Sequence, residues 1–302
     1  MSSQPPIRLA HLPSLVWEFT ESDFSTFVIP NTAFGVLAAL AAPALADCVE
    51  SPGIWPLLVK GAPRILLFNW ANLVVFDLAN QRLPESVKED LLNKPWRPLP
   101  QGHISPTQAR QLLLGAVPAA LAVSAALGVG SESAIIMLLI WMYNDLKGGD
   151  ELTRDPIIAA GYVVFLVSSL QIAIKTTTAT TVNISTTGYH WLGIVGGIIV
   201  TTMQIQDLKD QVGDRARERK TWPLVIGDRS SRRWIAACVV FWTFTCIFFW
   251  SAPPWMAAIP ILLGIWTAVG VLRKTGDAQV WRRWCLWQVS LYALPPLCSF
   301  FV

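Results

Sequence analysis

The chain has 302 residues, of which 53% are hydrophobic and only 14% are charged, with a formal net charge of +3. A soluble domain carries about 25% charged residues, so this composition excludes an ordinary soluble protein and indicates an integral membrane protein. No polar stretch is long enough to form a separate soluble domain, and residues 1–302 are therefore expected to form one transmembrane domain. We expect a lipid bilayer as its surroundings and no nucleic-acid partner.

Nine apolar segments are long enough, or nearly so, to cross a bilayer of about 30 Å. They lie at residues 25–46, 62–81, 108–127, 134–146, 156–174, 188–206, 232–250, 255–272 and 284–302. Ahead of the first segment, residues 15–20 predict an amphipathic helix at the membrane interface, anchored by Trp17 and Phe19. The expected fold is an all-α membrane bundle of about nine transmembrane helices.

The positive charges lie mainly on one side of this expected bundle. When alternate loops are assigned to the side of the N-terminus, that side holds 20 of the 23 Lys and Arg residues. Cytoplasmic loops carry an excess of Lys and Arg, which predicts a cytosolic N-terminus. The long loops at 82–107, 147–155 and 207–231 fall on the same side. We therefore expect the chemistry to face the cytosol.

Three carboxylates occur at the end of the sixth apolar segment. Asp207, Asp210 and Asp214 are spaced i, i+3 and i+7, so a helix places them on one face. Three like charges packed in this way repel one another, which predicts a cation beside them. Four basic residues follow directly: Arg215, Arg217, Arg219 and Lys220. Carboxylates at the mouth of a membrane helix, followed by basic residues, suit Mg²⁺ and a diphosphate.

A second acidic stretch follows the second apolar segment. Pro84 suits the first turn of a helix, and Glu85 beside it favours the positive end of the helix dipole. Glu85 and Glu89 share a face, whereas Asp90 lies about 100° from Glu89 around the helix. A solvated amphipathic helix explains this stretch when it is taken alone. Its place at the same membrane depth as the first cluster favours a shared site.

Polar side chains also lie inside the second apolar segment. Asn69, Asn72 and Asn80 fall on one helical face, and Asp77 is nearby. Amides in a membrane helix face the bundle interior, where either helix–helix hydrogen bonding or substrate contact explains them. Many of the 15 tryptophans are expected in the aromatic belt or facing lipid. These include Trp250, Trp255, Trp281, Trp284 and Trp287.

Two longer motifs resemble those of one family. The motif Asp90-x-x-Asn93-Lys94-Pro95-x-Arg97-Pro98-Leu99-Pro100-x-Gly102-x-Ile104-Ser105 resembles the segment after the first aspartate motif in the UbiA superfamily of membrane prenyltransferases. The motif Asp207-x-x-Asp210-x-x-Gly213-Asp214-Arg215, with Lys220-Thr221-x-Pro223, resembles the second motif of that family. The number and order of the apolar segments match as well, so the resemblance covers nearly the whole chain.

The first motif departs from the family pattern, which is usually Asn-Asp-x-x-Asp-x-x-x-Asp. Here Asn80 is followed by Gln81, and the carboxylates are those of Glu85, Glu89 and Asp90. The resemblance assigns Asp90, Asn80 and Glu85 to the motif, with Glu89 as an alternative to Asp90. Asp77 is an alternative shifted member.

The resemblance implies a chamber between the helices that holds an allylic polyprenyl diphosphate, with Mg²⁺ bridging the diphosphate to both acidic motifs. Lys147 and Arg154 match a loop that contacts the diphosphate in the family. The implied catalytic residues are Asp90, Asp207, Asp210 and Asp214. The implied metal ligands are Glu85, Glu89, Asp90, Asp207, Asp210 and Asp214. The implied substrate-binding residues are Asn72, Asn80, Gln81, Arg97, Lys147, Arg154, Arg215 and Lys220.

Within the superfamily, the altered first motif and the sequence from Tyr143 to Gly149 resemble fungal UbiA-type sesquiterpene cyclases. This resemblance implies an endoplasmic reticulum enzyme that ionises farnesyl diphosphate and cyclises the cation. The alternative is a prenyltransferase that passes the cation to an aromatic or other acceptor. A transporter that uses intramembrane charge and a catalytically inactive scaffold are further alternatives. The sequence indicates no oligomeric state.

Overall fold

The computed structural model describes residues 9–178, 183–274 and 276–301, so residues 1–8, 179–182, 275 and 302 of the expected single domain lie outside it. Within these ranges every regular element is helical, which confirms the expected all-α class. The longer helices are α1 (Leu12–Asp23), α2 (Ile29–Leu40), α5 (Ala62–Gln81), α6 (Pro84–Asn93), α7 (Pro106–Ala126), α8 (Gly130–Asn144), α9 (Arg154–Thr178), α10 (Thr186–Thr202), α11 (Asp207–Ala216), α13 (Asp228–Phe249), α14 (Pro254–Leu272), α15 (Asp277–Tyr292) and α16 (Leu294–Phe301). The shorter elements are α3 (Ala42–Leu45), α4 (Ile54–Pro56), α12 (Trp222–Val225), the 3-10 turns η1 (Leu9–His11), η4 (Gly148–Asp150) and η5 (Met203–Gln206), and the π-helical turns η2 (Phe24–Val28) and η3 (Leu57–Gly61).

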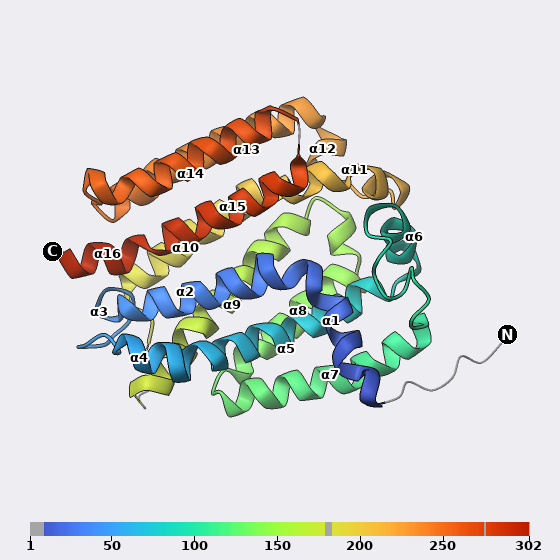
Figure 1. Ribbon diagram of the computed structural model, residues 1–302, viewed down its shortest axis with the longest axis horizontal. Coiled ribbons are helices and arrows are strands. Elements are labelled where there is room, and N and C mark those ends of the chain that lie inside the picture. Colours follow the sequence, from blue (N-terminus) through green and yellow to red (C-terminus); the bar gives the residue numbers. More distant parts are fainter. Residues whose placement is uncertain (1–8, 179–182, 275, 302) are drawn as a thin grey trace.

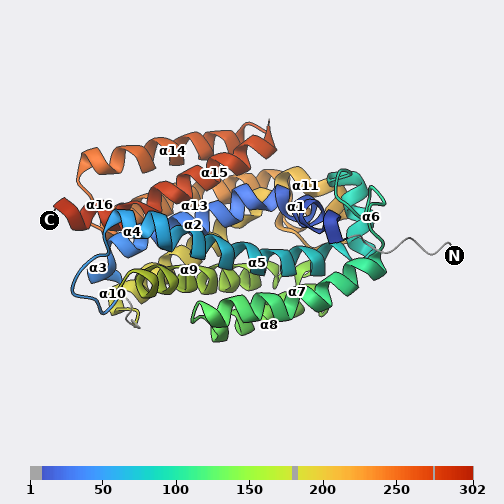
Figure 2. The same cartoon turned by 60° about the horizontal axis from the view of Figure 1, so that its bottom comes forward.

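The long helices run side by side along the long axis of the molecule (Figures 1 and 2). Helix α9 packs against α2, α5, α8 and α10, and its buried residues belong to the main hydrophobic core. Helices α6 and α11 lie together at one end, and α3, α4 and α16 lie at the other (Figure 1). The acidic segments that the sequence separates by more than 100 residues therefore meet at one end of the bundle.

Seven helical segments of the described chain are long and apolar enough to cross a membrane, which makes this an integral membrane protein. They are Leu12–Leu40, Ile54–Gln81, Pro106–Ala126, Arg154–Thr178, Thr186–Ala216, Asp228–Phe249 and Pro254–Leu272. The two other expected segments correspond to α8, with 15 residues, and to α15, with 16 residues followed by α16. The count of about nine transmembrane helices stays a prediction, as do the cytosolic loops.

The N-terminal helix differs from the sequence prediction. Helix α1 continues through the π-helical turn η2 into α2, so that one apolar segment runs over Leu12–Leu40. Trp17 is exposed, as expected of an interface residue, but Phe19 is buried in a small cluster with Leu78 of α5. The prediction of Phe19 as an interface anchor is wrong because α1 packs against α5. Asp23 consequently lies inside a membrane segment.

The prediction of an aromatic-belt position is also wrong for two tryptophans on α15. Trp284 and Trp287 are fully buried on α15. The indole Nε1 of Trp284 donates to Thr202 Oγ1 at 2.9 Å, and Nε1 of Trp287 donates to Thr243 Oγ1 at 2.9 Å. A buried indole N–H needs an acceptor, and the two threonines supply it. The hydropathy of the segment does not reveal these partners, since they lie on other helices.

The start of α10 requires a glycine. A Cβ atom added to Gly188 would lie 2.1 Å from the carbonyl oxygen of Leu45, which belongs to backbone and cannot move aside as a flexible side chain does. We expect Gly188→Ala to lower the free energy of unfolding by about 1–3 kcal/mol, the usual cost of overpacking a core. Thermal unfolding of the purified protein in detergent measures this. The matched control is Gly193→Ala on the same helix, where an added Cβ meets nothing within 4 Å. Equal melting temperatures for the two variants would contradict the expectation.

Candidate active site

A cavity lies between the helices at the end of the bundle that carries α6 and α11. It has about 1190 Å³ of empty space, including its open mouth. Its apolar wall comprises Phe27, Leu73, Phe76, Ile136, Leu139, Ile140, Ile157, Ile158, Phe165, Met203 and Trp281. Its polar wall comprises Asp23, Thr26, Asp77, Asn80, Glu89, Lys94, Arg97, Tyr143, Arg154, Tyr162, Gln206, Asp207, Asp210, Asp214 and Arg219. The cavity thus combines many apolar lining residues with a set of charged and polar ones, the usual form of a small-molecule site.

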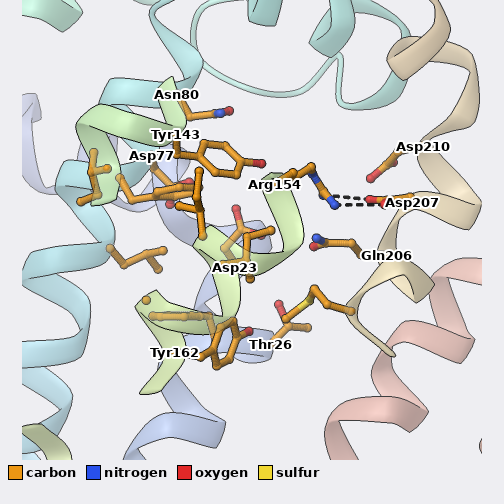
Figure 3. Close-up of a pocket in the computed structure, with 18 of the residues that line it drawn as sticks. Asp23, Thr26, Asp77, Asn80, Tyr143, Arg154, Tyr162, Gln206, Asp207 and Asp210 are labelled. Atoms are coloured by element: carbon orange, nitrogen blue, oxygen red, sulfur yellow. Dashed lines mark hydrogen bonds and ion pairs between the residues drawn. The ribbon is translucent and has the colours of Figure 1, made fainter. Parts of the chain in front are cut away.

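The row of aspartates on α11 lines this cavity. The chain leaves α10, passes through the 3-10 turn η5 and begins α11 at Asp207. Asp207, Asp210 and Asp214 all face the cavity, as their spacing on one helical face predicts. Figure 3 shows Asp207 and Asp210 on one side of the cavity, with Gln206 just before them in the chain.

Arg154 holds the first of these aspartates. Its guanidinium donates from Nη2 to Asp207 Oδ1 at 2.8 Å and from Nη1 to Asp207 Oδ2 at 3.0 Å (Figure 3). Nη1 also reaches Asp155 Oδ1 at 3.0 Å, and Gln204 Nε2 donates to Asp155 Oδ2 at 2.7 Å. All four side chains are buried. Two parallel N–H···O bonds fix a carboxylate in place, so Arg154 presents Asp207 in one orientation.

Arg219 reaches the site because the chain reverses after α11. Glu218 has a φ of +62°, and the N–H of Arg219 donates to the carbonyl oxygen of Asp214 at 3.0 Å, which closes α11 with a Schellman-type turn. The Arg219 side chain then lies 2.9 Å from Glu89 Oε1 and 3.3 Å from Asp214 Oδ1. Burial lowers the pKa of Arg219, but the acidic neighbours outweigh this and raise it above its usual value. Arg219 therefore stays cationic between the two acidic helices.

Two carboxylates of α6, Glu89 and Asp90, pair with different arginines. Glu89 Oε2 accepts from Arg217 Nη1 at 3.1 Å and lines the cavity. Asp90 is buried behind the cavity wall, where both of its oxygens accept from Arg97 Nη1 at 3.0 and 3.1 Å. Burial raises the pKa of Asp90, against the opposite effect of Arg97 and Lys94. Of the two alternatives left by the altered motif, it is Glu89 that faces the cavity.

One amide joins the two acidic helices. Asn93 Nδ2 donates to the carbonyl oxygen of Asp210 at 3.0 Å, and the N–H of Gly213 donates to Asn93 Oδ1 at 3.1 Å. A Cβ atom on Gly213 would lie 2.2 Å from Asn93 Nδ2. The short side-chain amide and the glycine are thus both needed to hold α6 against α11.

We expect Gly213→Ala to separate the two helices and to lower turnover at least about 10-fold, since small misplacements of a site are costly. The measurement is turnover in membranes at equal protein levels. The matched control is Gly115→Ala on α7, where an added Cβ meets nothing within 4 Å. Wild-type turnover by Gly213→Ala would show that the contact with Asn93 does not position the site.

Four predicted site residues lie at the surface beside the cavity. Glu85 and Lys147 pair with each other, with Nζ 3.1 Å from Oε1, and both side chains are exposed. The pKa of Glu85 is lowered by a hydrogen bond from its own backbone N–H and by Lys147. Lys220 pairs with Glu151 at 2.7 Å on the surface, and Arg215 is exposed as well. None of the four lines the cavity.

Two other predicted residues make buried contacts between helices. Asn72 accepts from Ser133 Oγ at 2.8 Å and donates to Ser124 Oγ at 3.3 Å, which ties α5 to α7 and α8. Gln81 Nε2 donates to the carbonyl oxygen of Phe19 at 2.8 Å, which ties α5 to α1. Of the two explanations given for amides in this helix, these contacts support helix–helix hydrogen bonding rather than substrate contact. Asn80, by contrast, lines the cavity.

The cavity also contains residues that the sequence prediction did not assign to the site. Asp23, Gln206, Arg219, Tyr143 and Trp281 lie in its wall. An acidic residue inside an apolar stretch is a signal for a functional position, and Asp23 met that criterion only once α1 and α2 proved to be one segment. Gln206 gave no such signal. Trp281, which was expected in the aromatic belt or facing lipid, lines the cavity instead.

The residues present suit Mg²⁺. The polar wall offers oxygen donors from Asp207, Asp210, Asp214 and Glu89, and Mg²⁺ prefers oxygen. Asp214 Oδ2 is buried and has no hydrogen-bond partner among the described residues, which leaves it free for a cation. Within the described chain, no three His, Cys, Asp or Glu residues gather closely enough to hold a metal ion by themselves. Mg²⁺ needs none, because it usually takes one or two carboxylates and completes its shell with water and substrate phosphates.

Comparison with known proteins gives the family. A family model described as the UbiA prenyltransferase family matches residues 36–291. The chain belongs to the UbiA prenyltransferase family. A solved UbiA homologue from Archaeoglobus fulgidus, bound to GPP and Mg²⁺, has the same fold at 11% identity, with a TM-score of 0.64 over 94% of this chain and 99% of that one. The resemblance stated from the two motifs is confirmed.

Relatives within the UbiA family include both synthases and a transferase. A somaliensene A/B synthase from Streptomyces somaliensis is 29% identical over 253 residues, 82% of this chain and 78% of the relative. A fumagillin beta-trans-bergamotene synthase from Aspergillus fumigatus is 27% identical over 287 residues, 92% of this chain and 90% of the relative. A polyprenyl transferase from Hericium erinaceus is 30% identical over 233 residues, 74% of this chain and 73% of the relative. The chain is therefore a UbiA-family enzyme that acts on a prenyl diphosphate.

Proposed function

We propose that the protein is a Mg²⁺-dependent terpene cyclase that ionises farnesyl diphosphate and closes the carbocation into a sesquiterpene, with release of diphosphate. The observation that carries the proposal is the mixed lining of the cavity. Carboxylates and arginines line it together with aliphatic and aromatic side chains. An allylic diphosphate likewise combines a charged head with an apolar tail. Two of the relatives described above are named as synthases, which supports cyclisation.

The charged residues would act on the diphosphate. Asp207, Asp210, Asp214 and Glu89 would hold Mg²⁺ together with the substrate phosphates, and the bound ion would supply charge stabilisation for the leaving group. Arg154 and Arg219 line the same opening and would donate to the diphosphate oxygens as the C–O bond breaks. Because both guanidiniums are buried, their N–H groups need no reorganisation at the moment of ionisation.

The apolar wall would guide the carbocation. Phe27 packs edge-on against Tyr162 and Phe165 with ring centroids 5.0 and 4.8 Å apart, and Phe76 packs against Tyr143 at 5.4 Å. Rings held by such contacts keep their positions while the substrate folds. Aromatic faces stabilise a cation by about 0.5–2 kcal/mol each. A dry, aromatic chamber also keeps water away from the cation until it is quenched.

The test is an incubation of membranes containing the protein with farnesyl diphosphate and Mg²⁺, without any acceptor. Cyclisation gives a volatile cyclic hydrocarbon together with diphosphate, and chelation of Mg²⁺ abolishes both. Release of farnesol alone, with turnover restored by a phenolic acceptor, would contradict cyclisation. That second result is the one expected of a prenyltransferase, the function of the Hericium erinaceus relative by its name.

The proposal includes a place in the cell. We propose that residues 1–302 form a single domain in the endoplasmic reticulum membrane, with the loops at 82–107, 147–155 and 207–231 in the cytosol. The excess of Lys and Arg on that side supports this orientation. Labelling of a cysteine introduced at Glu151, which is exposed beside the cavity mouth, tests it in sealed microsomes. Labelling by a membrane-impermeant reagent is expected without permeabilisation.

A further inference from the structure

Two acidic side chains in the cavity have no part in the site described so far. Asp77 lies on α5, and Asp23 is the last residue of α1, next to the π-helical turn η2. Both line the cavity. Figure 3 shows Asp77 across the cavity from Asp207 and Asp210, with Asp23 between them. Asp77 is therefore placed to meet the substrate chain from the other side.

One carboxyl oxygen of Asp77 is buried without a partner among the described residues. Asp77 is only 1% exposed, and its Oδ2 has no hydrogen-bond partner within the described chain. Leaving a buried carboxyl oxygen without a partner is costly, so it points to a ligand or a chemical role. Lys94 and Arg97 line the same cavity. Neither forms an ion pair with Asp77 among the described residues.

Asp23 lines the same cavity as Asp77. Asp23 Oδ2 also lies 3.2 Å from Nη2 of Arg97, and its side chain is 32% exposed. The cavity that would receive a proton on Asp77 therefore holds a second, partly exposed carboxyl group.

We propose that Asp77 is the base that ends the reaction and that Asp23 relays the proton away. This rests on the proposed cyclase function. In the final step a C–H bond next to the cationic carbon breaks, its electron pair forms the new C=C bond, and the proton binds to Asp77 Oδ2. The proton then passes to Asp23 and on to water at the mouth, which restores the Asp77 carboxylate. Diphosphate has already left with the electron pair of the C–O bond, so charges and atoms balance.

The position suits this chemistry rather than ionisation. A carboxylate on the Mg²⁺ side would serve the leaving group, but Asp77 lies in the same wall as Leu73 and Phe76 of α5, which belong to the apolar lining. A base must touch the hydrocarbon and stay out of bulk water until the cation has folded. Asp77 meets both conditions, because it is buried and lines the chamber.

The test compares Asp77→Asn with the wild-type enzyme, with farnesyl diphosphate as the probe. Asparagine has the same shape but does not take up the proton. Diphosphate release is expected to stay within 3-fold of wild type, while the main cyclic olefin falls at least 10-fold as a share of products. Alcohols from water capture and olefins from other proton losses replace it. Asp77→Glu is expected to restore part of the original olefin, which a merely structural role would not do.

Several results would overturn the assignment. An unchanged product mixture in Asp77→Asn means that a group other than Asp77 takes the proton. The released diphosphate is one such group. Loss of diphosphate release in parallel with all products places Asp77 in ionisation instead. If Asp77→Asn does not fold, as judged by thermal unfolding, Asp77→Glu and Asp23→Asn are compared, and unchanged products in both overturn the role. Absence of any cyclic product from the wild type overturns the proposed function and this inference together, whereas the other results leave the function standing.

Discussion

Replacement of Asp214 by asparagine is expected to lower diphosphate release from farnesyl diphosphate at least about 100-fold, the scale seen when one preorganised electrostatic group is removed. Asp214 lines the cavity and has a buried Oδ2 without a partner among the described residues, so the loss of its charge removes a ligand position for Mg²⁺. The amide keeps the shape of the side chain. We also expect the Mg²⁺ concentration for half-maximal turnover to rise. Asp207→Asn is expected to behave in the same way.

The matched control is Asp145→Asn. Asp145 lies at the end of α8 near the same opening but outside the cavity, where it pairs with Arg82 at 2.6 Å. An exposed ion pair contributes about 1 kcal/mol or less, so this variant should keep wild-type turnover. If diphosphate release by Asp214→Asn stays within 3-fold of the control, at equal protein levels and with unchanged Mg²⁺ dependence, the metal assignment on α11 loses its basis.

A second large loss of turnover is expected on substitution of Arg154. This substitution distinguishes Arg154 from Lys147, to which the sequence assigns the same role. Arg154→Lys keeps the positive charge but replaces the fork that holds both oxygens of Asp207. We expect turnover to fall about 100-fold, because an ammonium group does not reproduce two parallel hydrogen bonds. The variant should still fold, which the thermal unfolding temperature in detergent would show. Arg154→Ala is less informative, because it leaves a buried carboxylate unpaired and destabilises the fold itself.

Lys147→Ala is the comparison variant for Arg154→Lys. Lys147 pairs with Glu85 on the surface, and both side chains are exposed. Turnover within 3-fold of wild type is expected, since the substitution removes a solvated charge outside the cavity. A loss as large as that of Arg154→Lys would mean that the loop at 147–155 closes over the diphosphate during turnover and brings Lys147 to the substrate.

The part of the site on α11 could be predicted because its pattern is local. Three aspartates on one helical face need only helical geometry to be placed together, and they do line one cavity wall. The cations behind them could not be predicted in the same way. Arg219 lies in the cavity while Arg215 and Lys220 stay exposed, because the chain reverses at Glu218. Glu218 adopts a left-handed conformation, which glycine usually adopts and which a glutamate does not signal in the sequence.

The first acidic segment shows a different limit. Pro84 and Glu85 do start α6, as predicted, but the side that faces the cavity depends on how α6 rests against α11. That contact is made by Asn93 and Gly213, which are 120 residues apart in the chain. Asp90, on another side of α6, pairs with Arg97 instead of facing the cavity. Fold class and helix order follow from periodicity, whereas partners from distant helices appear only in three dimensions.

The arginines at the mouth have a thermodynamic consequence. Arg154 and Arg219 already neutralise Asp207 and Asp214, so a divalent cation arriving alone must compete with ion pairs that are buried. A diphosphate offers those arginines new partners and so releases the carboxylates to the cation. Each ligand therefore lowers the free energy of binding of the other, and by linkage the effect is reciprocal. The enzyme is expected to take up metal and substrate together, and to hold little Mg²⁺ between turnovers.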